Sequence, residues 1–156
     1  MISGLLLAFG IGVVTGLRSM TAPAVVAWAA HLGWMNLSGS PLAFMGSRWS
    51  VTLFTILALG EFVGDLLPAT PARTAALGLT ARIVIGSAVG ASAAIAGGIF
   101  LWLGAVCGVI GAVAGAFGGY RARASLVREL HVPDAAIAIP EDVIAIGLGL
   151  LLVTRF

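Results

Sequence analysis

Five stretches of apolar residues, separated by short polar segments, dominate the chain and are typical of helices that cross a membrane. They cover about residues 2–34, 50–67, 75–96, 98–120 and 140–156. A helix of roughly 20 apolar residues is long enough to cross the hydrocarbon core of a bilayer. The pattern therefore predicts an all-α fold, a polytopic transmembrane bundle of about five helices in one integral membrane domain, residues 1–156.

The first stretch is too long for one upright crossing, and we expect a break inside it. The run from Gly16 to Pro23 contains Arg18 and Thr21, and proline disrupts a helix because it lacks a backbone donor and clashes with the preceding turn. In a membrane such a break is tolerated only where it faces protein or water. The pattern predicts a broken first helix with free backbone donors at the break.

Two expectations concern the end of the chain. The basic stretch 121–131 is predicted to extend the fourth helix along the membrane surface. The last helix is expected to begin at about Pro140, because proline fits the first turn of a helix. Glu141 and Asp142 would then lie near the positive end of the helix dipole.

Small residues recur at every fourth position in several of the predicted helices. Residues four apart share one face of a helix, and a face of glycine and alanine lets two backbones approach closely in lipid. The faces could serve folding within the chain, a homodimer, or both. They are Gly12 and Gly16; Gly60 and Gly64; Gly78, Gly86, Gly90, Ala94 and Gly98; Gly104, Gly108 and Ala112; and Gly111, Gly115 and Gly119.

The composition of the chain excludes a soluble domain. The chain is 60% hydrophobic and 9% charged, whereas soluble domains carry about a quarter charged residues. Its net charge of +2 is too small to indicate nucleic-acid binding, and lipid is the expected surrounding. The single cysteine, Cys107, permits neither an internal disulfide nor a zinc site, and no cofactor is expected.

The placement of arginine predicts an orientation in the inner membrane. If five helices cross, the loops that hold Arg73 and residues 121–128 lie on one side, and Arg48 and Arg155 lie on the other. Cytoplasmic loops carry an excess of basic residues. The N-terminus is therefore expected in the cytoplasm.

Two acids within the second helix, Glu61 and Asp65, share one face of it. A charge at the bilayer centre costs about 2.5–3.5 kcal/mol on insertion scales, so both must face protein and find a partner or a proton. Arg82 and Arg18 are the candidate partners. A structural ion pair and a transport or binding site explain this pattern equally well. A metal site that includes Glu141 has no support from His or Cys spacing.

Two short runs resemble each other, Gly16 to Ala22 and Gly119 to Ser125. Each follows a glycine-rich apolar run and precedes a polar loop and another helix. With five crossings, the two helices that carry them run in opposite directions, which indicates an inverted repeat of helices 1–2 and 4–5 with helix 3 as the linker.

Three motifs together resemble one known family. They are GLRSMTAP at residues 16–23, E-x-x-x-D-x-x-P at residues 61–68, and GAFGGYRAR at residues 115–123 followed by P-E-D at residues 140–142. The chain resembles the bacterial membrane family called domain of unknown function 4126 over nearly its whole length. The resemblance implies a small multi-helix membrane protein and supplies no established activity or catalytic residues.

We hypothesise a small transporter or channel-like protein for a small or anionic solute, and we expect a homodimer. Arg18 and Arg121 would contact an anionic group, and the acids would carry protons or balance the arginines. The alternative is a non-transporting membrane scaffold or assembly factor whose charges only lock the helices together. The chain is not expected to be an enzyme, because no nucleophile–base pair or metal motif occurs. The candidate binding residues are Arg18, Thr21, Glu61, Asp65, Arg82, Arg121, Glu141 and Asp142.

Overall fold

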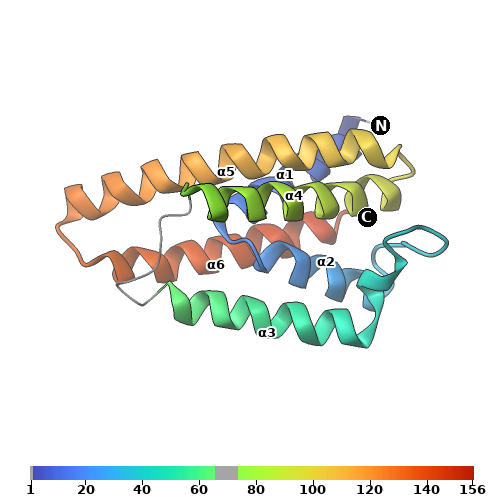
Figure 1. The fold of residues 1–156 in the computed structure, drawn as a ribbon, viewed down its shortest axis with the longest axis horizontal. Coiled ribbons are helices and arrows are strands. Elements are labelled where there is room, and N and C mark those ends of the chain that lie inside the picture. The colour runs from blue at the N-terminus through green and yellow to red at the C-terminus, as the bar shows by residue number, and fades with distance from the viewer. Residues whose placement is uncertain (1, 66–73) are drawn as a thin grey trace.

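The computed structural model of the chain describes residues 2–65 and 74–156, which form six α-helices, one 3₁₀ turn and no strand. The predicted all-α fold is confirmed. The helix count exceeds five because the first apolar stretch folds as two separate helices. The elements are α1 (Ile2–Leu17), α2 (Thr21–His31), η1 (Ala43–Gly46), α3 (Arg48–Gly64), α4 (Ala76–Ala96), α5 (Leu101–Leu130) and α6 (Asp134–Val153) (Figure 1).

Three of these helices are long and apolar enough to cross a membrane: α4, α5 and residues Ala136–Val153 of α6. α1 is also apolar but shorter. Large apolar side chains cover the outside of the bundle, for example Ile56 on α3, Val106 on α5 and Val143 on α6, each more than half exposed. Lipid solvates a surface of this kind, and water does not. The chain is therefore a membrane protein.

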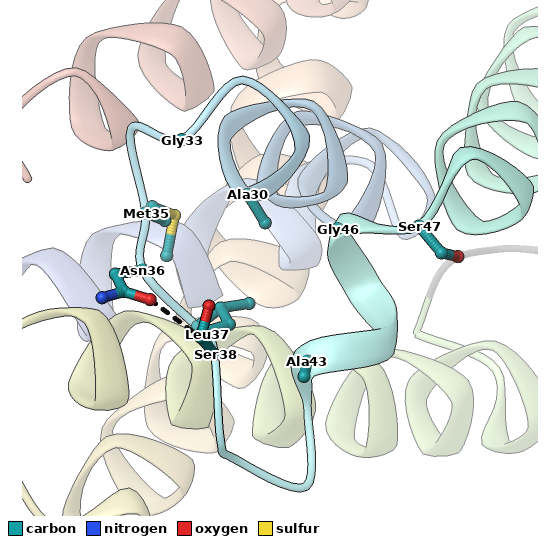
Figure 2. Close-up of a pocket in the computed structure, with 9 residues that line it drawn as sticks. All are labelled: Ala30, Gly33, Met35, Asn36, Leu37, Ser38, Ala43, Gly46 and Ser47. Atoms are coloured by element: carbon teal, nitrogen blue, oxygen red, sulfur yellow. Dashed lines mark hydrogen bonds between the residues drawn. The ribbon is translucent and has the colours of Figure 1, made fainter.

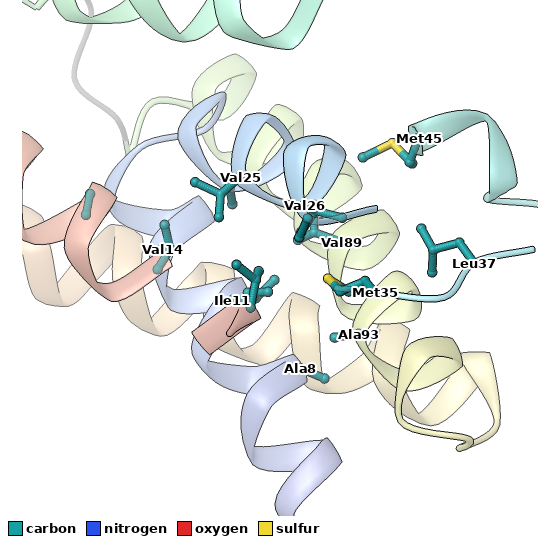
Figure 3. Packing of buried hydrophobic residues seen from close by; sticks show 14 residues of the cluster. Ala8, Ile11, Val14, Val25, Val26, Met35, Leu37, Met45, Val89 and Ala93 are labelled. Carbon is teal, nitrogen blue, oxygen red and sulfur yellow. The ribbon is translucent and has the colours of Figure 1, made fainter. Parts of the chain in front are cut away.

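The chain reverses direction between α1 and α2. Ile11 and Val14 of α1 share one buried cluster with Val26 of α2 and with Met35, which follows α2 (Figure 3). A helix that only kinked would carry Met35 far from Ile11, so the two helices form a hairpin. The predicted break lies where it was expected, but the chain reverses there and does not merely bend. Pro23 lies in the first turn of α2, where its missing N–H group is not needed.

The hairpin brings both ends of the chain to one end of the bundle. Figure 1 shows the N-terminus and the C-terminus together there, and the junction between α5 and α6 at the opposite end. That opposite end carries Arg121 and Arg128, near the end of α5. We expected the N-terminus on the same side as the arginine-rich loops. That expectation is wrong for residues 121–128, because residues 2–34 form a hairpin and not a single crossing. Arg73 lies outside the described residues.

The predicted inverted repeat is not confirmed. Gly4 of α1 packs against Ile99, which precedes α5, and Gly16 packs against Gly115 of α5. The residue numbers of the contacts increase together along α1 and α5, so these two helices run parallel. The repeat requires that they run in opposite directions. In addition, Arg121 lies inside the continuous helix α5, so the second run contains no break.

The small-residue faces do pack against one another inside the chain. A Cβ atom added to Gly86 of α4 would lie 2.9 Å from the carbonyl oxygen of Gly108 on α5. One added to Gly90 would lie 2.7 Å from the Cα atom of Gly108, and one added to Gly12 of α1 would collide with the carbonyl oxygen of Gly108. The backbones of α1 and α4 therefore both touch that of α5, which confirms the predicted role of these faces in folding.

The face on α3 is different. Added Cβ atoms on Gly60 and Gly64 would meet nothing within 4 Å, and Gly60 is exposed. This face therefore does not pack within the described part of the chain. The homodimer expected from the sequence stays a prediction.

α5 has 30 residues, which correspond to about 45 Å at 1.5 Å per residue. The hydrocarbon core of a bilayer is about 30 Å thick, so the last turns of α5 project beyond it. The predicted extension of this helix through the basic stretch is confirmed, whereas its course along the membrane surface stays a prediction. It ends at His131, whose φ of 53° is left-handed and stops the helix.

α6 begins at Asp134, six residues before the expected start, and Pro140 lies inside it. Glu141 and Asp142 are therefore about two turns into the helix, and the prediction that they lie at the positive end of its dipole is wrong. Proline in a helix interior removes one backbone hydrogen bond, and neighbouring groups in a membrane bundle can satisfy the freed carbonyl.

Candidate functional site

Arg18 directly follows α1 and is buried in the bundle, with its side chain 1% exposed. Its guanidinium group forms ion pairs with Asp65, which follows α3, and with Asp142 on α6. Its Nη2 atom also donates to the carbonyl oxygen of Ala138 at 3.5 Å, and its Cζ atom lies 5.7 Å from the centre of the Phe62 ring. One buried cation thus holds together the α1–α2 turn, α3 and α6.

Glu61 of α3 caps the start of α2. The Ser19 backbone N–H and hydroxyl donate to Glu61 Oε1 at 2.8 and 2.6 Å, and the Met20 N–H donates to Oε2 at 2.9 Å. The N-terminus of a helix has unsatisfied N–H groups and a partial positive charge, so it attracts anions. Met20, the N-cap residue, makes no side-chain capping bond, and Glu61 takes that role.

Arg82 of α4 holds the other side of the break. Its Nε atom donates to the carbonyl oxygen of Gly16 at 3.1 Å, near the end of α1, where carbonyl groups lack partners within the helix. Its Nη2 atom lies 3.7 Å from Glu61 Oε1. An acid thus binds the free N–H groups of α2, an arginine binds a free carbonyl of α1, and the two pair with each other. The predicted partnership of the acids with Arg82 and Arg18 is confirmed.

Arg123 of α5 completes the network, and the sequence-based prediction missed it. Its Nη1 atom lies 3.4 Å from Asp65 Oδ2 and 3.4 Å from Glu141 Oε2. Arg121 was predicted instead, but it is exposed and takes part in no ion pair among the described residues. Residues two apart point to opposite sides of a helix, so only one of these arginines can face inward.

A signal for Arg123 was present in the sequence. It continues the four-residue series Gly111, Gly115 and Gly119, whose members are all buried on α5. A residue four positions after the last glycine of a packed face lies on the same face. The periodicity of the small residues could therefore have selected Arg123 over Arg121.

Thr21, also predicted, lies at the same break but outside the ion pairs. It is the first residue of α2, its side chain is 2% exposed, and its hydroxyl has no hydrogen-bond partner among the described residues. Buried polar atoms are nearly always hydrogen-bonded, so this hydroxyl is an exception.

The network combines arginines with carboxylates. Among the described residues it contains three arginines and four carboxylates. No group of three or more His, Cys, Asp and Glu residues in the described part is arranged to hold a metal ion. The arrangement can bind or exchange anions and protons. Its members are Arg18, Glu61, Asp65, Arg82, Arg123, Glu141 and Asp142.

A separate hollow of about 480 Å³ lies at the other end of the bundle, between the end of α2 and the loop that leads to α3 (Figure 2). Small and polar side chains such as Asn36, Ser38 and Ser47 line it, and none of the described lining residues is ionisable. The side chain of Asn36 accepts from the N–H group of Ser38 at 3.0 Å. This hollow lacks the charges that a site for ions requires.

The fold and the network define a helical membrane protein with charged residues that compensate one another inside the bundle. A family model described as Domain of unknown function (DUF4126) matches residues 5–155, and the chain belongs to this family. The resemblance that the motifs indicated is thus confirmed. No curated protein and no solved structure matches the chain. Its function is therefore argued from its geometry.

Proposed function

We propose that this protein carries a small anionic solute across the membrane, with the network of arginines and carboxylates as its site. The break between α1 and α2 supports this proposal most strongly, because Glu61 and Arg82 hold its backbone ends inside the bundle. Non-helical backbone at membrane depth is tolerated where protein buries it or where it lines a cavity, and broken helices form the substrate sites of many transporters.

Several residues of the network share partners. This favours a site whose side chains can move over one that only holds the helices in place. Asp65 pairs with both Arg18 and Arg123, and Arg18 also pairs with Asp142. If Asp65 moves away from Arg18, Arg18 still pairs with Asp142, and its charge is therefore not left without a partner in the membrane.

A non-transporting scaffold is the second candidate. The observation that favours it is the burial of Arg18, whose side chain is 1% exposed, beside helices whose backbones touch. In this role the ion pairs would fix the arrangement of the helices, a use for which buried charges are known. A partner that co-purifies in a stoichiometric amount, together with no anion flux, would favour the scaffold.

Anion flux in liposomes tests the proposal. Wild-type protein is expected to carry formate, acetate or chloride inward, measured with labelled anions and an internal pH dye. Glu61→Gln is expected to lower the flux about tenfold or more, because an amide cannot take up a proton and loses charge-assisted hydrogen bonds.

The matched control is Glu129→Gln, the same chemical change at an exposed position near the end of α5. It is expected to leave the flux unchanged. Equal flux through the two variants, or no flux of any of these anions through the wild type, would count against transport.

We further propose that the protein lies in an inner membrane and that the arginine-rich end of α5 faces the cytoplasm. Arg121 and Arg128 are exposed at that end, and basic residues are enriched on the cytoplasmic side. Because the termini lie at the other end, this orientation puts both of them outside the cytoplasm.

Cysteine labelling in intact spheroplasts tests this topology. In a Cys107→Ala background, Ser38→Cys and Thr154→Cys are expected to react with an impermeant maleimide, because both positions are exposed at the end that carries the termini. Ala124→Cys, exposed on the last turns of α5, is expected to react only after lysis. Ser3→Cys, exposed near the N-terminus, is expected to react without lysis, and reaction only after lysis would contradict the hairpin.

A further inference from the structure

The carboxylate of Glu61, on α3, accepts hydrogen bonds from donors in the turn between α1 and α2. The Ser19 N–H and hydroxyl reach Oε1 at 2.8 and 2.6 Å, and the Met20 N–H reaches Oε2 at 2.9 Å. Arg82 Nη2 lies 3.7 Å from Oε1. Each carboxylate oxygen thus receives one backbone N–H group, and a hydroxyl and a guanidinium group complete the surroundings of one planar anion.

The anion that fills these donors sits on a peripheral helix. α3 packs chiefly against α2 and η1, and it lies at the edge of the bundle in Figure 1. Glu61 is 12% exposed, and three rotatable bonds join its carboxylate to the backbone. The carboxylate can therefore leave the donors by side-chain rotation, whereas the donors are fixed in the backbone at the break.

A second observation at the same break points to a ligand. The Thr21 hydroxyl follows Met20 directly, its side chain is 2% exposed, and it has no hydrogen-bond partner among the described residues. The Arg18 Nε atom, one residue before Ser19, is also buried without such a partner in the described part. Buried polar atoms are rarely left so, and these two belong to the residues directly before Ser19 and directly after Met20.

We infer that the turn between α1 and α2 is a binding site for a small carboxylate anion, and that Glu61 fills it as a tethered competitor which the anion displaces. The identification of this anion as the transported solute rests on the proposed function. The binding site itself rests on the contacts of Glu61 and on the two unused polar groups. A carboxylate is the favoured ligand because the group now in the site is a carboxylate.

Charge balance sets the stoichiometry of the exchange. An incoming carboxylate would make the charge of the site more negative by one. A displaced Glu61 that takes one proton from solution cancels this added charge. Because an additional charge inside a membrane is costly, the exchange favours one proton with each anion, which is electroneutral entry.

Chemical rescue of Glu61→Ala tests the site. The truncation empties the donors, so acetate or formate is expected to restore at least half of the loss in melting temperature, whereas chloride at equal ionic strength is not. The matched control is Glu141→Ala, which removes an acid paired with Arg123 on a different helix. No carboxylate-specific rescue is expected there. Equal effects of acetate and chloride, or equal rescue of both variants, would overturn the inference.

Glu61→Asp keeps the test decisive if the alanine variant does not fold. It retains the charge, but its side chain is one methylene shorter and holds the donors less well. Labelled acetate is expected to bind this variant about tenfold more tightly than the wild type, a change of about 1.4 kcal/mol. Equal binding would refute the competition. Rescue of Glu61→Ala without anion flux through the wild type would support the anion site and contradict transport. Flux without rescue would support transport and contradict the anion site.

Discussion

Replacing Arg18 by methionine is expected to lower the melting temperature and the yield of folded protein strongly. Arg18 is 1% exposed and pairs with both Asp65 and Asp142. Removal of one partner of a buried ion pair costs about 3–5 kcal/mol, because the remaining charge is buried without compensation. Whole domains are stable by only about 5–15 kcal/mol, so a loss of this size removes a large share of the free energy of unfolding.

The measurement is the yield of monodisperse protein in detergent and its melting temperature. Arg155→Met is the control, because Arg155 is exposed near the C-terminus and forms no ion pair among the described residues. The double variant Arg18→Met/Asp142→Asn is expected to be more stable than Arg18→Met alone, because one fewer carboxylate lacks a cation. A single variant as stable as the control would show that the ion pairs contribute nothing to the fold.

Replacing Gly108 by valine is expected to prevent α4 from packing against α5. A Cβ atom at this position would collide with the carbonyl oxygen of Gly86 and lie 2.9 Å from the Cα atom of Gly90. Both are backbone atoms, so no side-chain rotation relieves the contact and whole helices must move. Overpacking of a core by single methylenes costs about 1–3 kcal/mol, and valine adds three carbon atoms.

Gly108→Ala is expected to show a smaller loss in the same direction, seen as a lower melting temperature. Gly118→Ala is the matched control on the same helix, because a Cβ atom added there would meet nothing within 4 Å. Alanine favours a helix over glycine by up to about 1 kcal/mol, so the control should be unchanged or slightly more stable. Equal melting temperatures for the two alanine variants would contradict the close approach of the helices.

Much of the fold could be predicted because its cause is periodic along the chain. The small residues at every fourth position predict which faces meet, and Gly12, Gly90 and Gly108 do meet. The cost of an unpaired charge in lipid predicts that Glu61 and Asp65 find arginines, and both do. Neither prediction depends on the direction in which a helix runs.

Predictions that depended on chain direction were less successful. A break within residues 16–23 was expected, but a proline near a polar run does not reveal whether the chain bends or reverses. The reversal made α1 and α5 parallel, removed the basis of the inverted repeat and moved the N-terminus to the other end. Likewise, local preference suggested that Pro140 starts a helix, whereas the packed bundle contains it within α6.

The sequence by itself determined that lipid surrounds this protein, that its helices approach through glycine, and that its internal acids need arginine. These follow from composition, from the 3.6-residue period of a helix and from the cost of charge in a membrane. Only the tertiary structure decided that the broken helix is a hairpin and that Glu61 occupies the start of α2. These depend on contacts between residues distant in sequence, which no local pattern encodes.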